Sequence, residues 1–359
     1  MNTIGDKIKE LRSLMGYSLQ DLASMVNVSK AAIQQYENGS TTPSNIVLKN
    51  IARAFGINVW DFFKTPVINY GLDSVKFRDG HTLFDKKKEE TLIKKDVIKY
   101  VRNYIELEAI LDNNVKFENP ISDFLITSYS DVEKAVKKIR RKWKLGNSPI
   151  DSICDLIESK GVKVVSINRN IGSGGLSGWI EDIPVIIIND YFEHTRETTR
   201  RRFTLLHELG HILMKLDLDS ITEDIEEYYC NRFAAAFLLV DEAAIEYFGK
   251  NRTSISLGEL KEIKLKYGIS IKAIIFRMNS LKLIDDYIKD MVIKDYEIWQ
   301  DGREDFGEYT KSDEKPKRFK FLLRSALTEK RIEKNKASEL SNIPIDKLNE
   351  LTIKNFNLN

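Results

Sequence analysis

The chain has 359 residues, of which 42% are hydrophobic and 31% are charged, and this balance excludes a disordered or collagen-like chain. The 56 Lys and Arg residues against 54 Asp and Glu give a net charge of +2. A uniformly basic nucleic-acid coat is therefore excluded, although a local basic face is not. At roughly 150 residues per domain, the length predicts two or three domains.

The two cysteines, Cys154 and Cys230, cannot form a disulfide framework, which favours a reducing compartment. The first 14 residues are polar and amphipathic and carry no signal-peptide core. No apolar run approaches the ~20 residues needed to span a bilayer. We therefore expect a cytoplasmic protein with no membrane partner.

Hydrophobic periodicity predicts a mainly α fold with a small β-sheet. The predicted helices cover residues 2–64 (five short helices), 85–111, 131–145, 201–216 and 223–239, and the predicted strands cover 162–165 and 185–188. The remainder of the chain, to residue 359, is expected to be mostly helical.

Two of the short N-terminal helices are predicted to form a helix-turn-helix. They cover residues 19–25 and 30–37. Ser18 and Ser29 are suited to cap them, and Asn27 tolerates the left-handed conformation that a tight turn between them needs. The second helix of such a unit enters the major groove of DNA.

The outward residues of this second helix are the predicted DNA contacts. They are Ser29, Lys30, Ala31, Gln34 and Gln35. Gln can pair with an adenine edge, and Lys can reach phosphate or guanine. Residues 2–64 carry seven Lys and Arg against five Asp and Glu, so we expect DNA affinity to depend on homodimerisation or on other basic segments. The alternative is a small helical bundle that only mediates protein contacts.

The N-terminal block resembles the phage-repressor (Xre/Cro-like) helix-turn-helix family over about its first 63 residues. The resemblance is carried by Ile4-Gly5, Leu11-Arg12, Ser18-x-x-x-Leu22-Ala23, Val28-Ser29-x-x-x-Ile33-x-x-Tyr36-Glu37-x-Gly39 and Pro43. It implies a double-stranded DNA operator as a partner.

A second motif lies on the hydrophobic helix that contains His207, Glu208 and His211. Positions i and i+4 share one helix face, so His207 and His211 can offer two imidazoles to one metal ion. Glu208 projects about 100° away and is better placed to reach a metal-bound water. With Zn²⁺, such a carboxylate can act as general base in peptide hydrolysis. The alternative is a hydrogen-bonded histidine pair in the core.

A catalytic zinc site needs a third protein ligand, and the pattern of residues leaves several candidates open. The candidates are Asp217, His81, His194, Glu223, Glu226 and Glu227. Spacing favours neither free histidine, and Asp217 would need the helix to break. Glu226 and Glu227 each share a face with apolar residues, so periodicity does not choose between them.

The region from about Asp131 to Leu283 resembles the ImmA/IrrE family of metallo-endopeptidases. The resemblance is carried by Trp143-x-x-Gly146-x-x-Pro149-Ile150, Gly161-Val162, Gly175-Leu176-Ser177-Gly178-Trp179, Asn189, Arg200, Arg202-Phe203-Thr204-x-x-His207-Glu208-Leu209-Gly210-His211 and Glu227-x-x-Cys230-Asn231-Arg232-Phe233-Ala234-Ala235-x-x-Leu238-Leu239. It implies that Glu227 is the third zinc ligand, and that such proteases relieve repression by cutting a repressor of the Xre type.

Four further features of the sequence call for an interpretation: three of them have two alternatives each, and the fourth has one. Cys230 is either a zinc-binding thiolate or, more simply, a small buried core residue. The basic run Lys134–Lys144 either binds nucleic acid or is the solvated side of a docked helix. The cluster Arg200–Arg202 contacts an acidic partner or anchors to a neighbouring loop. The strand Val185–Ile188 is a candidate sheet edge that could hold an extended substrate.

The C-terminal third predicts two helical units. Leu260–Phe276 has the pattern of a helix, a tight Gly turn and a Ser-capped helix, and it resembles the segment that follows the peptidase in the ImmA/IrrE family. Glu314–Leu351 is predicted to be another helical unit, which we interpret as an interaction or sensing segment.

The leading hypothesis is a DNA-binding transcriptional regulator with a zinc-dependent endopeptidase domain that cleaves a repressor, either a partner or the chain itself. The rival is a non-cleaving repressor or antitoxin that uses the zinc fold as a scaffold for a toxin, and a third hypothesis is a metal-sensing regulator. The predicted domains are a helix-turn-helix domain (1–66), a helical connector (67–130), a zincin-like α+β peptidase domain (131–284) and a helical C-terminal region (285–359).

Overall fold

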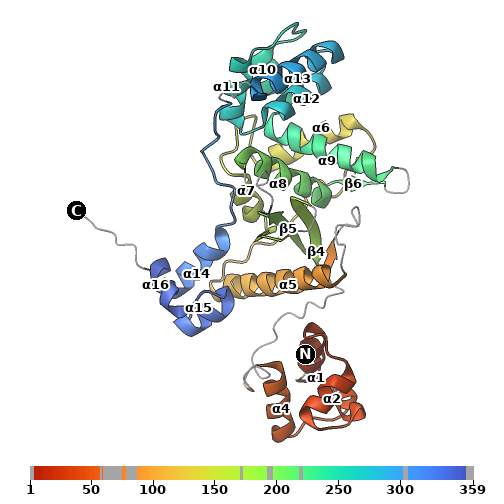
Figure 1. Cartoon of the computed structure of the whole chain (residues 1–359), viewed down its shortest axis with the longest axis vertical. Helices are drawn as coiled ribbons and strands as arrows, with labels where there is room; N and C mark the ends of the chain where they lie inside the picture. Colours follow the sequence, from red (N-terminus) through yellow and green to blue (C-terminus); the bar gives the residue numbers. More distant parts are fainter. Residues whose placement is uncertain are drawn as a thin grey trace, which may run out of the picture. The chain divides into compact units, whose positions relative to one another are not determined.

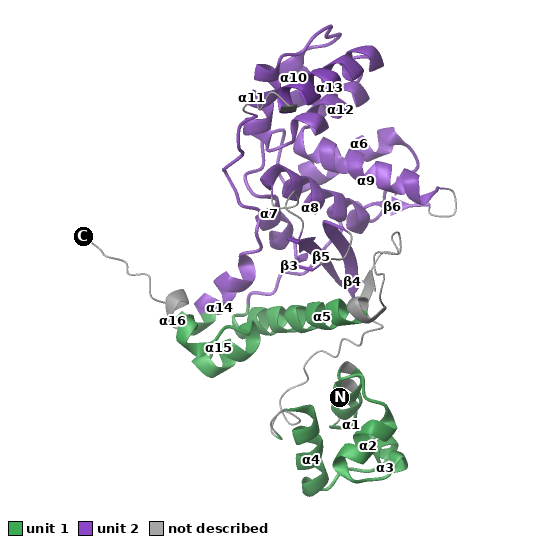
Figure 2. Cartoon of the chain, in the orientation of Figure 1, with its two compact units in different colours: residues 1–76, 86–112, 326–359 green, residues 77–85, 113–325 purple. Residues whose placement is uncertain are grey.

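The computed structural model describes residues 4–56, 59, 75–77, 87–169, 173–191, 197–217, 221–301 and 306–352. The chain divides into two compact units, one of residues 1–76, 86–112 and 326–359 and the other of residues 77–85 and 113–325 (Figure 2). The described part is mainly helical with a small β-sheet, as predicted (Figure 1). None of its helices is both long and apolar enough to cross a membrane.

The N-terminal residues form four helices, α1 (Ile4–Leu14), α2 (Leu19–Val26), α3 (Lys30–Glu37) and α4 (Asn45–Phe55). The predicted caps are confirmed, since the hydroxyls of Ser18 and Ser29 accept backbone N–H groups of α2 and α3. Asn27 ends α2 with φ of 57°, the left-handed conformation expected of the turn. The fifth predicted helix and the boundary at residue 66 lie outside the described residues.

The helix-turn-helix packs on an apolar centre, and a partly buried ion pair joins α1 to α3. Its core residues are Ile8, Leu22, Ala23, Val26, Ile33, Leu48, Ile51, Ala52 and Phe55. Arg12 of α1 donates to both carboxylate oxygens of Glu37 at the end of α3, at 2.6 and 3.0 Å. A Cβ at Gly5 would lie 2.1 Å from the carbonyl oxygen of Tyr36, so only glycine lets α1 approach α3 this closely.

The predicted connector helix and the C-terminal helices belong to the same compact unit. These elements are α5 (Lys87–Ile110), α15 (Lys334–Ser341) and α16 (Ile345–Thr352). Asn103 of α5 donates to the carbonyl oxygen of Leu340 at 2.6 Å, and Lys336 of α15 lies 2.7 Å from the carboxylate of Glu106. Segments about 240 residues apart in the sequence are therefore packed together, and the predicted domain boundaries stay a prediction.

A β-sheet forms one layer of the larger unit, with its strands in the order β4-β5-β3. These strands are β3 (Lys163–Ile167), β4 (Gly175–Ile180) and β5 (Ile183–Asn189), and the short strand β1 covers Val75–Phe77. β5 pairs antiparallel with β4 and parallel with β3. Strands β2 (Leu125–Ile126) and β6 (Lys215–Leu216) pair in parallel and form a second, two-stranded sheet.

The prediction that Val185–Ile188 forms a sheet edge is wrong. These residues lie in β5, which has β4 on one side and β3 on the other. All four side chains are buried, and a continuous β-branched run is typical of a strand covered on both faces, as central strands are. A substrate could not add to β5 as a further strand, because both of its edges are already paired.

Helices cover the sheet and supply most of the core. They are α6 (Tyr129–Lys142), α7 (Ile153–Ser159), α8 (Thr198–Leu213) and α9 (Glu223–Leu238), and α8 lies beside both the sheet and α9 (Figure 1). The two apolar helices cross closely at Gly210, where an added Cβ would lie 3.3 Å from the ring of Phe233 and 3.5 Å from Cα of Cys230. This close crossing brings the side chains of α9 within reach of the histidines of α8.

A group of four helices, α10 (Asp241–Phe248), α11 (Leu257–Tyr267), α12 (Ile271–Ser280) and α13 (Asp286–Asp301), continues the same core, and α14 (Arg318–Thr328) follows (Figure 1). The predicted Gly turn is confirmed, since Gly268 ends α11 with φ of 63°. The hydroxyl of Ser270 caps α12 by accepting from the N–H of Ala273.

Candidate functional sites

The helix-turn-helix presents the predicted DNA-contacting residues to solvent. Ser29, Lys30, Ala31, Gln34 and Gln35 are all exposed on α3 or at its start. The opposite face of α3 is buried in the core of this domain. The whole outer face of α3, with two amides and one ammonium group, is therefore free to meet a nucleic acid.

A compact set of metal-binding groups lies where α8 and α9 cross. The Nε2 atoms of His207 and His211 lie 3.1 Å apart. The carboxylate of Glu227 lies 3.2 Å from Nε2 of His207 and 3.1 Å from Nε2 of His211. Among the described residues, His207, His211 and Glu227 form the one group of at least three His, Cys, Asp or Glu side chains that could hold a metal ion.

The spacing of these three groups fits a tetrahedral zinc ion. Zinc binds imidazole nitrogen and carboxylate oxygen at about 2.0–2.2 Å, so two ligands of a tetrahedral ion lie about 3.3 Å apart. The Nε2 atoms of His207 and His211 lie 3.1 Å apart, Oε2 of Glu227 lies 3.2 Å from the first, and Oε1 of Glu227 lies 3.1 Å from the second. Two imidazoles and one carboxylate are also a ligand set of catalytic zinc, which leaves the fourth position open.

Glu208 follows His207 on α8 and is not one of the three grouped side chains. Its side chain is buried and lies against the start of β4. A Cβ at Gly175 would lie 3.0 Å from Oε1 of Glu208 and 2.5 Å from Cγ2 of Thr204. Because Gly175 has no side chain, there is space beside it for the Glu208 carboxylate.

Asn231, to which sequence reasoning gave no role, and Glu226, which it left as a candidate ligand, contact the far nitrogens of the histidines. Oδ1 of Asn231 lies 3.1 Å from Nδ1 of His207, and Oε1 of Glu226 lies 3.0 Å from Nδ1 of His211. The sulfur of Cys230, which is fully buried, lies 3.3 Å from the same nitrogen of His211. The sequence signal that could have identified these residues is that they lie within about one helical turn of Glu227 on α9.

The pKa values of His211 and Glu227 are shifted by their neighbours. Burial alone would lower the pKa of His211, but hydrogen bonds with Cys230, Glu226 and Glu227 outweigh it and raise that pKa to about 12. Hydrogen bonds with His207 and His211 hold the pKa of Glu227 well below its usual range. The surrounding acidic groups thus favour positive charge at this point, as a cation site requires.

The other candidates for a third ligand do not join the set. Asp217 and Glu223 are exposed, and Glu226 faces the nitrogen of His211 that points away from Glu227. His81 and His194 lie outside the described residues. The interpretation of Cys230 as a buried residue of the core fits its position in the structure, with the added contact to His211.

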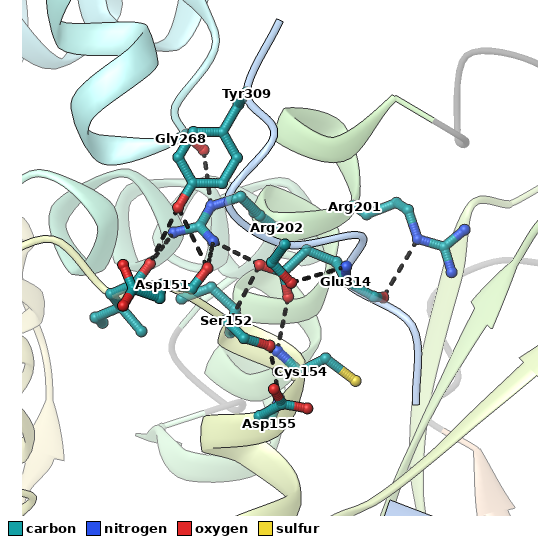
Figure 3. A network of polar contacts seen from close by, with 12 residues as sticks. Asp151, Ser152, Cys154, Asp155, Arg201, Arg202, Gly268, Tyr309 and Glu314 are labelled. Carbon is teal, nitrogen blue, oxygen red and sulfur yellow. Dashed lines mark hydrogen bonds and ion pairs between the residues drawn. The ribbon is translucent and has the colours of Figure 1, made fainter. Parts of the chain in front are cut away.

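The arginine cluster at the start of α8 anchors to a loop of the same unit (Figure 3). The guanidinium of Arg202 pairs with the carboxylate of Glu314, and neither side chain is exposed. Arg202 also stacks on the ring of Tyr309, 4.6 Å from its centroid, while Arg201 pairs with Asp190. Of the two interpretations of this cluster, anchoring to a neighbouring loop is therefore correct for Arg201 and Arg202.

Three lysines of the basic run on α6 are paired with carboxylates of the same unit. Lys134 pairs with Asp131, Lys137 with Asp241 and Glu242, and Lys138 with Asp123. Arg140 is buried and donates to the carbonyl oxygens of Gly146, Ser148 and Phe237. These contacts favour the solvated side of a docked helix over a nucleic-acid surface.

Two family models match the chain. A helix-turn-helix model matches residues 8–59, and the model of the IrrE N-terminal-like domain matches residues 157–279. The second match contains α8 and α9 with all four residues of the predicted zinc site. It confirms the resemblance to a metallopeptidase family.

Among curated proteins, an uncharacterized HTH-type transcriptional regulator of Bacillus subtilis is 34% identical over 58 residues, which are 16% of this chain and 88% of the relative. A putative HTH-type transcriptional regulatory protein of Pyrococcus furiosus is 26% identical over 188 residues, 52% of this chain. The chain spans only about half, 54%, of the length of that archaeal relative. Among solved structures, the Bacillus thuringiensis regulator PlcR, in complex with the peptide PapR7 and DNA, is 13% identical with a TM-score of 0.17 over 99% of this chain and all of that one.

The chain belongs to the Xre-like helix-turn-helix transcription regulators, and it combines that DNA-binding domain with an IrrE-like domain of the metallopeptidase type. The predicted class of protein is thereby confirmed.

Proposed function

We propose that this regulator is also a zinc-dependent endopeptidase, which cleaves an Xre-type repressor and so relieves repression. The observation that carries the proposal is the grouping of His207, His211 and Glu227: the two Nε2 atoms lie 3.1 Å apart, and each has one oxygen of the Glu227 carboxylate within 3.2 Å, as ligands of one zinc ion would. The repressor that is cut is either a partner bound at the same operator or the chain itself.

Each residue of the site has a separate task in this proposal. His207, His211 and Glu227 hold the ion, and a bound zinc would act as a Lewis acid that makes a water molecule nucleophilic near neutral pH. Glu208 is not one of the three grouped ligands, and in this proposal its carboxylate takes the proton of the attacking water and passes it to the leaving amine. Glu208 is thus the proposed general base.

The helix-turn-helix would bring this chemistry to its substrate. Ser29, Lys30, Ala31, Gln34 and Gln35 are the proposed contacts to double-stranded DNA, and their exposure on α3 supports that role. A repressor bound to the same operator would be held at high local concentration near the peptidase. DNA binding and proteolysis would then act on one promoter.

The test compares wild-type protein with Glu208→Gln. Each is loaded with zinc and incubated with the repressor that co-purifies with it, and the products are identified by mass spectrometry. We expect discrete repressor fragments with wild type and none with Glu208→Gln, while both proteins keep zinc and bind DNA equally. His207→Ala is the matched variant that should lose zinc and cleavage together.

The same experiment separates the rival functions. A scaffold or antitoxin that cleaves nothing predicts intact repressor with both proteins and no change in derepression. A metal sensor predicts DNA binding that changes with zinc but is indifferent to Glu208→Gln. Either result would overturn the peptidase proposal.

A further inference from the structure

The helix α9 contacts both sides of the two site histidines, and not only the side that faces Glu227. On the far side, Nδ1 of His207 lies 3.1 Å from the amide oxygen of Asn231, whereas Nδ1 of His211 lies 3.0 Å from the carboxylate of Glu226 and 3.3 Å from the sulfur of Cys230. The side chains of His211 and Glu226 are 8% and 12% exposed, so this contact is largely shielded from water.

An acceptor at Nδ1 determines which nitrogen of an imidazole can bind a metal ion. A neutral imidazole carries one N–H, and only its other nitrogen has a free lone pair. An oxygen at Nδ1 favours the hydrogen there and leaves Nε2 to coordinate. The Nε2 atoms of His207 and His211 are the pair that lies 3.1 Å apart beside Glu227.

We propose that Glu226 and Asn231 are positioning residues, which fix both imidazoles with the hydrogen on Nδ1 and both Nε2 atoms directed at the metal. This inference rests on the proposed zinc function of the same site. The two acceptors are unequal, because a hydrogen bond to a carboxylate is about twice as strong as one to a neutral amide. Glu226 therefore orients His211 more firmly than Asn231 orients His207.

The same helix makes the arrangement specific. Glu226 and Glu227 are adjacent on α9, so their side chains leave the helix about 100° apart and approach opposite edges of the His211 ring. The close crossing of α8 and α9 at Gly210 sets the distance at which both carboxylates can reach the ring. One helix thus supplies a proposed ligand and the two residues that aim the other ligands.

The first measurement is zinc affinity, determined by competition with a fluorescent chelator, for wild type, Glu226→Ala and Asn231→Ala. We expect each alanine variant to bind zinc about 10- to 100-fold more weakly, with the larger loss for Glu226→Ala. Glu226→Gln and Asn231→Asp keep an acceptor, so Glu226→Gln should lose less than Glu226→Ala, and Asn231→Asp should bind at least as tightly as wild type. Glu223→Ala, an exposed glutamate of the same helix, should bind zinc as wild type does.

The second measurement is long-range ¹H–¹⁵N NMR of the zinc-loaded proteins. Wild type should show the Nδ1–H resonances of both histidines, and each alanine substitution should remove the resonance of its own partner. If wild type binds zinc but the alanine variants bind it within about twofold and keep both resonances, the positioning role is refuted while the peptidase proposal stands. Equal losses in the alanine and the conservative variants would also refute it. If wild type binds no zinc, the proposed function itself fails.

Discussion

The carboxylate of Glu314 is paired with the guanidinium of Arg202, and both side chains are completely shielded from solvent. The same carboxylate accepts from the backbone N–H groups of Ile153 and Cys154, at 3.1 and 2.8 Å, so it also caps the start of α7 (Figure 3). Arg202 lies five residues before His207 on α8. One buried ion pair therefore fastens the helix that carries both histidines.

Glu314→Gln should lower the stability of the larger unit by about 3–5 kcal/mol, because it leaves the buried charge of Arg202 without its counter-charge. The measurement is denaturant unfolding followed by tryptophan fluorescence. Asp286→Asn is the control, since it removes one partner of an exposed ion pair on α13 and should change nothing measurable. Equal stability of Glu314→Gln and wild type would show that the pair is dispensable.

Zinc should raise the melting temperature of the wild-type protein, since a ligand that binds only the folded state stabilises it. At a free concentration of 100 times its dissociation constant, the gain is about 2.7 kcal/mol, which corresponds to about 5–10 °C for a unit of this size. Differential scanning fluorimetry with zinc and with a chelator measures it. Glu208→Gln should keep the shift and His211→Ala should lose it; a shift that survives in His211→Ala would place the ion elsewhere.

Gly175→Ala should abolish cleavage while zinc binding persists. The added methyl group would lie 2.5 Å from Cγ2 of Thr204 and 3.0 Å from Oε1 of Glu208, so both side chains of α8 have to shift and the carboxylate leaves its position beside β4. The check is a cleavage assay beside a chelator competition on the same protein. Gly258→Ala, where an added Cβ would meet only the hydroxyl of Ser256 at 3.8 Å, is the matched substitution that should stay active. Full activity of Gly175→Ala would show that the added methyl group does not displace the Glu208 carboxylate from its working position.

The outer face of α3 should carry both parts of DNA recognition. Gln34→Ala should weaken binding to the selected operator by about 1–3 kcal/mol and relax the preference at one base pair, as expected when a bidentate contact to a base is lost. Lys30→Ala should instead weaken binding to all sequences and reduce the salt dependence by about one phosphate contact. Fluorescence anisotropy over a salt series measures both, and Lys49→Ala on α4 is the control. Unchanged binding in both α3 variants would exclude this face.

Local patterns were sufficient for the parts of the molecule that depend on neighbours in the sequence. The caps at Ser18 and Ser29, the left-handed Asn27 and the shared face of His207 and His211 each follow from spacings of four residues or fewer. Helix ends differed by a few residues, as with α8, predicted over 201–216 and observed over Thr198–Leu213. Such ends depend on packing more than on propensity.

What the sequence could not reveal depends on distant partners. Periodicity left Glu226 and Glu227 equivalent because both faces of α9 are packed, and only the crossing with α8 separates their roles. The run Val185–Ile188 was predicted as an edge, since its two neighbours, β3 and β4, are recognised only by pairing. Arg202 and Glu314 are 112 residues apart, and no short-range pattern connects them.

The position of Glu314 also sets a limit on how far the protein can be shortened. The matched family region ends at residue 279, whereas the counter-charge of Arg202 is supplied 35 residues later. A recombinant fragment that keeps α7 but ends at residue 279 would leave the guanidinium of Arg202 without its counter-charge and the start of α7 without the Glu314 cap, and we expect it to aggregate on expression. Fragments intended for crystallisation or inhibitor screening should therefore extend through Lys317, whose backbone N–H bonds the carboxylate of Glu158.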